Sequence, residues 1–300
     1  SLKELRDELG LGSWAVRTSF NTNYQGVVIQ QQPGEGNRKH HHPEADENWV
    51  IMDGEFEWWI DGKGTMKVKT GDISNIKWDF TDKKVLIVGD SRGIGECLFA
   101  NFVKSGADVY GINSSNCDIS NIGEIDSYFT HNLPDGIDIL VNNAGITFAK
   151  KIEDISVDEW DSVIDTNLRS FFYITKQVLW NMPIGGKIVN VSSIAGRNKS
   201  IGNAGVHYTS SKAGIIGLTK QIAHEVGERN INVNAVCPSQ TRTDMLEESM
   251  TEKELKELGK LIPLGRIATR QEVVNGILFL CSDESSYITG TTLDINGGQL

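Results

Sequence analysis

Short apolar segments alternate with helical patterns over much of the chain, and this alternation is its clearest feature. Residues 84–88, 137–141 and 187–191 are mainly apolar and read as buried strands. Residues 160–180 carry apolar side chains at helical spacing between two of these strands. Strict alternation of strand and helix predicts a parallel sheet covered on both faces. Sites in such folds lie at the carboxyl ends of the strands.

The pattern changes before residue 81. Here, short alternating runs at 26–32, 49–52, 55–60 and 65–69 are separated by Gly and Asp turns, which predicts antiparallel hairpins. We therefore expect two domains, an all-β domain at residues 1–80 and an α/β domain at residues 81–300. The predicted linker is 79–83.

A glycine-rich turn follows the first apolar strand of the α/β domain. Gly89, Gly93 and Gly95 separate the strand from a helical pattern at 94–105. Glycines let the main chain approach a pyrophosphate, and a helix N-terminus offers free N–H groups to it. Such a loop is a weak signal alone, but its position between a strand and a helix predicts a dinucleotide site.

Tyr208 and Lys212 are four residues apart in a helical segment, so they share one face. A nearby ammonium favours the phenolate and lowers its pKa, which makes the pair a proton donor or acceptor for a carbonyl/alcohol couple. The alternative is an exposed tyrosine beside a solvated lysine.

Residues 82–300 resemble the short-chain dehydrogenase/reductase family, near its ketoacyl reductases. The resemblance is carried by Gly89-x3-Gly93-x-Gly95, Asn142-Asn143-Ala144-Gly145, Asn167, Ser193, Tyr208-x3-Lys212 and the segments 287–290 and 296–298. It implies a Rossmann-type, doubly wound parallel sheet. It also implies an NAD(P)-dependent oxidoreductase that interconverts a ketone and a secondary alcohol by hydride transfer.

The resemblance assigns a role to each catalytic position. Tyr208 would be the general acid in reduction and the general base in oxidation. Lys212 would lower the pKa of Tyr208 and bind the nicotinamide ribose. Ser193 would hydrogen-bond the substrate oxygen, unless it only caps a loop. Asn167 would hold a water that links Lys212 to solvent, unless it only satisfies buried main chain.

The same resemblance implies a set of cofactor-binding residues. Asp118 would contact the adenine, although it could be a turn residue, and Thr243 would contact the nicotinamide carboxamide. The full set is Gly89, Ser91, Arg92, Gly93, Ile94, Gly95, Asn113, Ser114, Asp118, Ile119, Asn143, Ala144, Gly145, Tyr208, Lys212, Pro238, Thr241 and Thr243.

The expected cofactor is NADP, with NAD as the alternative. An acidic residue after the second strand would bind a ribose 2′-hydroxyl, but Asn113 follows the strand at 108–112 and no carboxylate stands there. Arg92 lies in the phosphate loop, where it could reach a 2′-phosphate. The stretch from Ile112 to Asp118 is short for the family, so a helix and most of a strand are expected to be absent.

The N-terminal region contains Gly34-x5-His40-x-His42-x4-Glu47-x6-Gly54, which resembles the first motif of the cupin family. The resemblance implies a truncated jelly roll, because the second motif is not intact. His40, His42 and Glu47 would suit a divalent transition metal. The alternative is a degenerate β domain that packs or dimerises.

Composition narrows the classes of function. The net charge is −11, which disfavours nucleic acid and anionic membranes as partners. Four scattered cysteines with no zinc or disulfide spacing suit a reducing cytosol, so we expect a cytoplasmic protein. The apolar residues at 273–280 and the segment 291–300 are expected to form the interface of a homodimer or homotetramer.

Two rivals to a reductase of small carbonyl compounds remain. One is a bifunctional enzyme whose cupin-like half acts separately on a sugar-type substrate. The other is a non-catalytic scaffold that only binds the cofactor.

Overall fold

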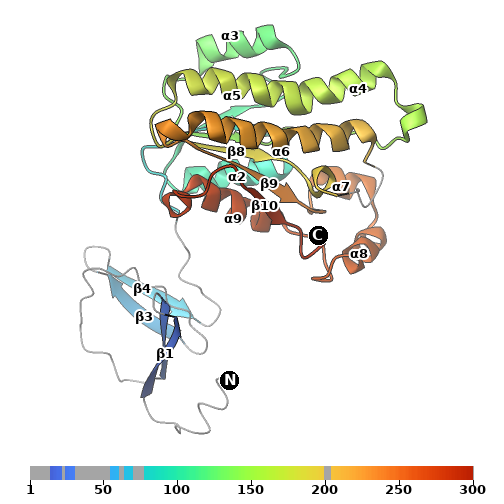
Figure 1. Cartoon of the computed structure of the whole chain (residues 1–300). Helices are drawn as coiled ribbons and strands as arrows, with labels where there is room; N and C mark the ends of the chain where they lie inside the picture. Colours follow the sequence, from blue (N-terminus) through green and yellow to red (C-terminus); the bar gives the residue numbers. More distant parts are fainter. Residues whose placement is uncertain are drawn as a thin grey trace. The chain divides into compact units, whose positions relative to one another are not determined.

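The chain divides into two compact units, Ser1–Ile76 and Lys77–Leu300. The computed structural model describes residues 14–21, 24–30, 55–60, 64–69, 78–198 and 204–299 (Figure 1). The division falls slightly before the expected boundary at residue 80. Phe80 explains the difference, because it is buried in the core of the second unit with its ring 4.8 Å from that of Phe102.

The described part of the first unit consists of two antiparallel strand pairs. They are β1 (Trp14–Asn21) with β2 (Tyr24–Gln30), and β3 (Glu55–Ile60) with β4 (Gly64–Lys69). The predicted strands at 26–32, 55–60 and 65–69 correspond to β2, β3 and β4, whereas β1 was not predicted. The strand predicted at 49–52 lies outside the described residues.

The described part of the second unit is built on a parallel sheet of six strands in the order β10-β9-β8-β7-β5-β6. In chain order these are β5 (Lys84–Val88), β6 (Asp108–Ile112), β7 (Ile139–Asn142), β8 (Lys187–Val191), β9 (Asn232–Pro238) and β10 (Thr292–Ile295). The Rossmann-type sheet predicted from the alternation of strands and helices is confirmed.

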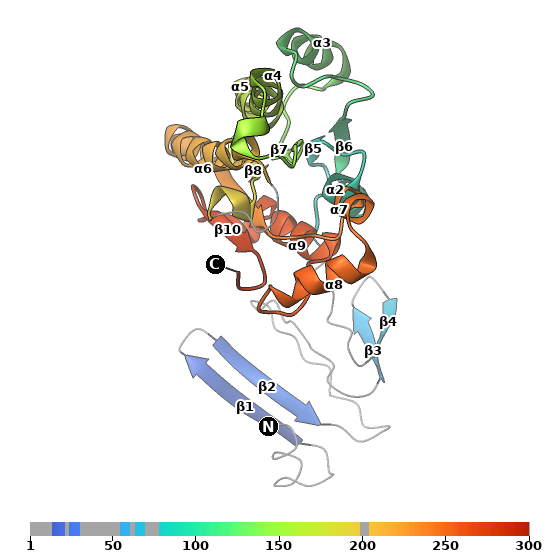
Figure 2. The same ribbon diagram turned by 90° about the vertical axis from the view of Figure 1, so that its right-hand side faces the viewer.

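Helices cover both faces of this sheet (Figures 1 and 2). They are α2 (Gly93–Lys104), α3 (Ile122–Asn132), α4 (Val157–Ile164), α5 (Ser170–Asn181), α6 (Val206–Val226), α7 (Asp244–Ser249), α8 (Glu252–Lys260) and α9 (Arg270–Cys281). Side chains of β5 alternate between the faces, as a strand requires. Val85 and Ile87 pack with α2 and α9, whereas Leu86 and Val88 pack with α3, α5 and α6.

The sheet ends at β6, because the chain passes from β6 through a short turn to α3. The expected absence of a helix and a strand at this point is confirmed. The strand order reverses between β5 and β7, which are parallel neighbours. The strand that follows β5 in the chain, β6, lies on one side of this pair, and the strands that follow β7 lie on the other. A crevice at such a reversal is the usual place for a bound dinucleotide.

Helix α9 does not offer the apolar surface that we expected for an interface. Its apolar residues, including Val273, Val274, Ile277 and Leu278, are buried within the unit against β5, β7, β8 and β9. Periodicity alone could not tell burial against the unit's own sheet from burial against a second subunit. The part of the expected interface at 273–280 was therefore wrong, whereas the part at 291–300 stays a prediction.

Candidate active site

Tyr208 and Lys212 lie one turn apart on α6. The Lys212 side chain is 3% exposed, and its Nζ lies 5.6 Å from the centroid of the Tyr208 ring. Nζ donates a hydrogen bond of 2.9 Å to the Val191 carbonyl at the end of β8, and it lies 5.7 Å from the Phe171 ring. An ammonium has three donors, so this bond leaves others for a ligand. The burial of Lys212 excludes the alternative that it is a solvated lysine on the surface.

Ser193 follows β8 and begins a single 3₁₀ turn, Ile194–Gly196. Its Oγ accepts the Ala195 N–H at 3.1 Å, so the hydroxyl does cap this turn. The same side chain lies close enough to the Tyr208 phenol to lower its pKa. A hydroxyl can donate and accept at once, so capping does not prevent Ser193 from acting on a ligand oxygen.

Two contacts hold the Ser193 segment against α6. The Ser192 hydroxyl donates to the Lys212 carbonyl at 2.7 Å. A Cβ on Gly196 would lie 2.6 Å from the Lys212 carbonyl carbon, so the two main chains approach too closely for a larger residue. The relative placement of Ser193 and Tyr208 is therefore fixed by main-chain contacts with Lys212.

Asn167 lies in a π-helical turn, Asp165–Arg169, between α4 and α5. Such turns often occur at functional sites. Its Oδ1 accepts the Ile146 N–H at 2.8 Å, and its Nδ2 donates to Ile146 O at 2.9 Å and to Ser211 Oγ at 3.1 Å. The expected alternative, satisfaction of buried main chain, is therefore observed. Coordination of a water remains a prediction.

Gly145 brings Asn167 and Lys212 together. A Cβ on Gly145 would lie 3.3 Å from Lys212 Nζ and 3.5 Å from Asn167 Oδ1. The two polar groups therefore face the same small space beside the segment after β7. All four predicted catalytic residues lie at the carboxyl edge of the sheet or on the helices above it.

Burial shapes the proton affinities at this site. It raises the pKa of the Tyr208 phenol above its ordinary value, and the hydrogen bond from Ser193 partly opposes this effect. Burial also lowers the pKa of the Lys212 ammonium to about 8. Without a bound cofactor the phenol is therefore a weaker acid than usual. That Lys212 lowers the pKa of Tyr208 remains a prediction for the complex.

The glycine-rich turn has the geometry of an anion-binding site. Gly89 has a φ of 88° and Gly93 a φ of 62°, which favour glycine. A Cβ on Gly95 would overlap the Gly89 carbonyl oxygen, so α2 and the turn meet directly. The Gly93 N–H donates to Asp244 Oδ2 at 3.2 Å. A carboxylate thus lies at the N-terminus of α2, where a phosphate would bind.

The turn after β7 supports the glycine-rich turn. The Asn143 side chain donates to Gly89 O at 2.8 Å. The main-chain N–H groups of Asn143 and Ala144 both donate to Val88 O, at 3.0 and 2.8 Å. A Cβ on Gly89 would lie 2.7 Å from Ala144 Cα. These contacts hold the walls of the crevice at the reversal of strand order.

Residues predicted for the adenine side are largely exposed. Ser114 and Asp118 are exposed, and Asp118 Oδ1 accepts from the Ser120 N–H and hydroxyl at 2.9 and 2.8 Å. The turn alternative for Asp118 is therefore observed. Ile119 is half-buried against the core. Contact with adenine remains a prediction for these residues.

The predicted residues near the nicotinamide follow β9. Pro238 ends that strand, and Thr241 is buried with its hydroxyl donating to Ser239 O at 3.0 Å. The Thr243 methyl group would lie 3.5 Å from a Cβ on Gly93. This segment therefore lies against the glycine-rich turn. Ser91 and Arg92 are exposed in that turn, and Ile94 is half-buried behind it.

Three polar residues of this edge were not predicted. Asp244 accepts from Gly93 N–H and pairs with Arg270 at 2.6 Å, and the paired guanidinium lowers the pKa of Asp244. Asp90 reaches the end of β6, where Asn113 Nδ2 donates to Asp90 Oδ1 at 2.9 Å. Asp90 directly follows Gly89 in the sequence, and this position in the loop was the only signal available.

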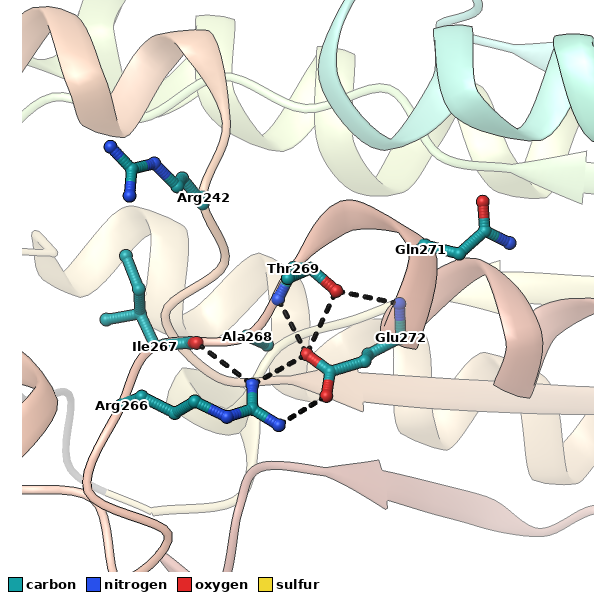
Figure 3. Close-up of a pocket in the computed structure, with 7 residues that line it drawn as sticks. All are labelled: Arg242, Arg266, Ile267, Ala268, Thr269, Gln271 and Glu272. Atoms are coloured by element: carbon teal, nitrogen blue, oxygen red, sulfur yellow. Dashed lines mark hydrogen bonds and ion pairs between the residues drawn. The ribbon is translucent and has the colours of Figure 1, made fainter. Parts of the chain in front are cut away.

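A separate cavity of about 520 Å³ lies at the start of α9 (Figure 3). Its charged groups are already paired. Arg266 forms an ion pair with Glu272 at 2.5 Å, and Arg242 contacts Glu247 at 2.7 Å. Glu272 also accepts the Thr269 N–H at 2.8 Å, which completes the cap of α9. We assign this cavity a structural role.

The predicted metal ligands His40, His42 and Glu47 lie outside the described residues. Among the residues that are described, no group of three or more His, Cys, Asp or Glu side chains could hold a metal ion. None of the described helices is both long and apolar enough to cross a membrane.

A parallel sheet with a glycine-rich turn, and with Tyr, Lys, Ser and Asn side chains grouped at its carboxyl edge, is typical of dinucleotide-dependent oxidoreductases of the Rossmann class. Residues 93–299 match the family model described as enoyl-(acyl carrier protein) reductase. This chain belongs to the short-chain dehydrogenase/reductase family.

Curated relatives and solved structures agree with this membership. The 3-oxoacyl-[acyl-carrier-protein] reductase FabG of Aquifex aeolicus is 38% identical over 243 residues, which cover 72% of this chain and 96% of that protein. A 3-oxoacyl-[acyl-carrier protein] reductase structure from Brucella melitensis has a TM-score of 0.69 at 31% identity, and it covers 78% of this chain and 98% of that one. The ligand-free aldohexose dehydrogenase of Thermoplasma acidophilum has a TM-score of 0.67 at 35% identity, with coverage of 73% and 94%.

The N-terminal region has its own relationship. Residues 27–77 match the cupin domain model. The cupin-like nature of this region, expected from the His40, His42 and Glu47 motif, is confirmed. Its capacity to bind a metal stays a prediction.

Proposed function

We propose that this protein catalyses the reversible reduction of a ketone to a secondary alcohol, with Tyr208 as the proton donor and acceptor. One observation carries the proposal. Ser193, Tyr208, Lys212 and Asn167 come from three separate elements, yet they converge on one space at the carboxyl edge of the sheet. Neither the core nor the helix caps require this combination of polar groups in one place.

The side chains divide the work of the reaction. The Ser193 hydroxyl and the Tyr208 phenol can both donate to a carbonyl oxygen, which polarises the carbonyl and places it for reduction. The phenol then gives its proton to that oxygen. Lys212 keeps free N–H donors for the hydroxyls of a ribose, because Val191 uses only one of them. A bound nicotinamide cofactor supplies the hydride.

The cofactor fits the residues that are present. The N-terminus of α2 already holds a carboxylate through Gly93, which supports binding of a phosphate at this end of the helix. Arg92 is exposed and has no ion-pair partner among the described side chains, which supports the NADP(H) form predicted from the sequence. The half-buried carboxylate of Asp90, in the same turn, opposes binding of a 2′-phosphate.

We also propose a homodimer or homotetramer in the cytoplasm. Helices α4 and α5 expose large apolar side chains, including Val157 at 74%, Trp160 at 37% and Phe172 at 49%. An apolar surface of this kind suits an interface with closed symmetry. A monomeric mass by light scattering at micromolar concentration would contradict the assembly.

The direct test is a screen of ketones and secondary alcohols with NADH, NADPH and their oxidised forms. The panel should include 3-oxoacyl thioesters and aldohexoses, because the relatives act on these classes. We expect turnover with at least one carbonyl compound. Cofactor binding without oxidation by any ketone would instead favour the non-catalytic scaffold.

A chelator added to the same assay tests whether carbonyl reduction depends on a metal in the cupin-like domain. Tyr208 and Ser193 can polarise a carbonyl without a metal, so we expect reduction to survive chelation and the double change His40→Ala/His42→Ala. Loss of reduction on chelation, with recovery on adding metal, would favour a functional link between the cupin-like half and the reductase. Metal content measured in parallel tests the bifunctional alternative.

A further inference from the structure

The carboxylate of Asp90 lies at the end of β6, although Asp90 belongs to the glycine-rich turn after β5. Its Oδ1 accepts from Asn113 Nδ2 at 2.9 Å. Its Oδ2 lies directly over Gly111, where a Cβ would overlap the carboxylate. Gly111 therefore provides the space that this carboxylate occupies. The side chain of Asp90 is half-buried.

Several hydrogen bonds fix this arrangement before any ligand binds. The Oδ1 of Asn113 accepts from the Ser115 N–H at 3.0 Å and from its hydroxyl at 2.6 Å, which directs the Asn113 amide nitrogen toward Asp90. The Tyr128 hydroxyl and the Asn116 side chain both donate to Gly111 O, at 2.8 and 3.0 Å. The groups that contact the Asp90 carboxylate are thus themselves held in place by hydrogen bonds.

Register places this carboxylate where a dinucleotide ribose binds. Val88 pairs with Ile112, and Gly89 N–H donates to Ile112 O at 2.6 Å, so the turn and the end of β6 are adjacent. In doubly wound sheets an acid at the end of the second strand binds the ribose 2′-hydroxyl. Here Asn113 occupies that sequence position, and the acid reaches the same place from the neighbouring turn.

The charge around Asp90 is not neutralised within the described residues. No described cation forms an ion pair with Asp90, and Arg92, two residues further along the same turn, is exposed. An exposed guanidinium attracts a phosphate weakly, because solvent and salt screen it. A half-buried, oriented carboxylate is screened less, so its repulsion of a 2′-phosphate outweighs the attraction by Arg92.

We propose that Asp90 binds the adenosine ribose hydroxyls and makes NAD(H), rather than NADP(H), the preferred cofactor. This proposal rests on the proposed function only in that a nicotinamide dinucleotide binds in the crevice. It reverses the choice made from Arg92, which rested on the absence of a carboxylate at the end of the second strand. Folding supplies that carboxylate from another segment.

Binding of NADH and of NADPH to the full chain, measured by fluorescence, tests the proposal without requiring a substrate or turnover. A hydrogen bond to a charged group contributes about tenfold or more in affinity, so we expect NADH to bind at least about tenfold more tightly than NADPH. Asp90→Asn keeps the shape and the bond to Asn113 but removes the charge. It should shift the NADH to NADPH ratio of dissociation constants toward NADPH by at least about tenfold.

Two further variants serve as an independent test and as a control. Gly111→Ala should displace the Asp90 carboxylate. It should therefore also shift the ratio of dissociation constants toward NADPH, without any change to Asp90 itself. Asp108→Asn, at the opposite end of β6, removes an exposed carboxylate that accepts only from Tyr110 among the described side chains, and it should leave the ratio unchanged.

The outcomes separate this proposal from the function it builds on. Tighter binding of NADPH by the wild type, or an unchanged ratio in Asp90→Asn with a native circular dichroism spectrum, overturns the role of Asp90 and leaves the reductase function standing. Failure of the wild type to bind either dinucleotide overturns the proposed function itself, and the role of Asp90 with it.

Discussion

The two halves of the proposed cofactor crevice are built differently. On the nicotinamide side, Lys212 and Asn167 are almost completely buried, and their polar atoms bond to main-chain groups of neighbouring elements. On the adenine side, β6 is the edge of the sheet, and Ser114 and Asp118 are exposed. The reacting side is thus enclosed by the core, and the recognising side lies at the margin of the fold.

This difference follows from the short connection after β6. A chain that passes directly from β6 to α3 leaves one side of β6 without a neighbouring strand. Residues at that edge have fewer packing constraints, so they can change without disturbing the core. Chemistry should therefore be intolerant of substitution on the nicotinamide side, and recognition should be adjustable on the adenine side.

Loss of the Tyr208 hydroxyl should have the largest effect. Tyr208→Phe keeps the ring beside Lys212 and removes the proton donor, so we expect turnover to fall by at least about 100-fold with cofactor binding retained. Steady-state rates and cofactor titration check this. Tyr173→Phe is the control, because Tyr173 bonds only to Asp126 and Gln177 among the described residues. Near-normal turnover in Tyr208→Phe would exclude the assigned role.

Removal of the Lys212 ammonium should weaken the cofactor complex and change its pH dependence. Burial lowers the pKa of Lys212 to about 8, so the free protein loses this charge as the pH rises through that value. Cofactor affinity of the wild type should then fall above about pH 8. Lys212→Met should bind about tenfold more weakly and show no such fall.

The same substitution should stabilise the fold. A lysine with a lowered pKa resists protonation in the folded state, so its charge opposes folding at pH 7. This penalty is lost as the pH rises from the folded pKa of about 8 to the unfolded value of 10.5. Lys212→Met should therefore raise the thermal midpoint at pH 7. Lys220→Met, an exposed change on the same helix, is the control. A lower midpoint in Lys212→Met would argue that the ammonium is structural.

A change on the adenine side should be milder. Asp118→Asn keeps the turn with Ser120 and removes only the charge. If Asp118 contacts the adenine, which NADH and NADPH share, both cofactors should bind about two- to tenfold more weakly. Their ratio should not change. Equal affinity in the variant and the wild type would restrict Asp118 to its turn.

The smallest effect should come from Glu272, which lines the separate cavity at the start of α9 (Figure 3). Its hydrogen bonds to Arg266 and Thr269 lower its pKa to about 2. A lowered carboxyl pKa contributes stability above the unfolded value of 4.5, and this contribution is lost as the pH falls toward about 2. The groups are exposed, so Glu272→Gln should cost less than about 1 kcal/mol at pH 7.

Urea unfolding at pH 7 and pH 4 checks this last prediction, and activity should be unchanged. Glu257→Gln removes an exposed carboxylate paired with Lys260 and serves as the control. A difference from the wild type that is equal at both pH values would show that ionisation of Glu272 does not contribute. The comparison therefore tests whether the lowered pKa of Glu272 reflects a contribution to stability rather than a part in the reaction.

Much of the nicotinamide side could be predicted from the sequence. Tyr208 and Lys212 are four residues apart on one helix, so local geometry alone places them together. The strands at 84–88, 108–112 and 187–191 were predicted to the residue, because short apolar runs between glycines and polar turns have few other solutions. The short segment after Ile112 likewise indicated that a helix and most of a strand would be absent there.

The tertiary structure decided what depends on distant segments. Asp90 and Asn113 are 23 residues apart, and the pairing of β5 with β6 brings the carboxylate to the end of β6, where we propose that the ribose binds. Asp244 and Gly93 are 151 residues apart and meet at the N-terminus of α2. The apolar pattern of α9 was visible, but not whether it would pack on its own sheet. Local periodicity determines elements, whereas packing determines which charges share a site.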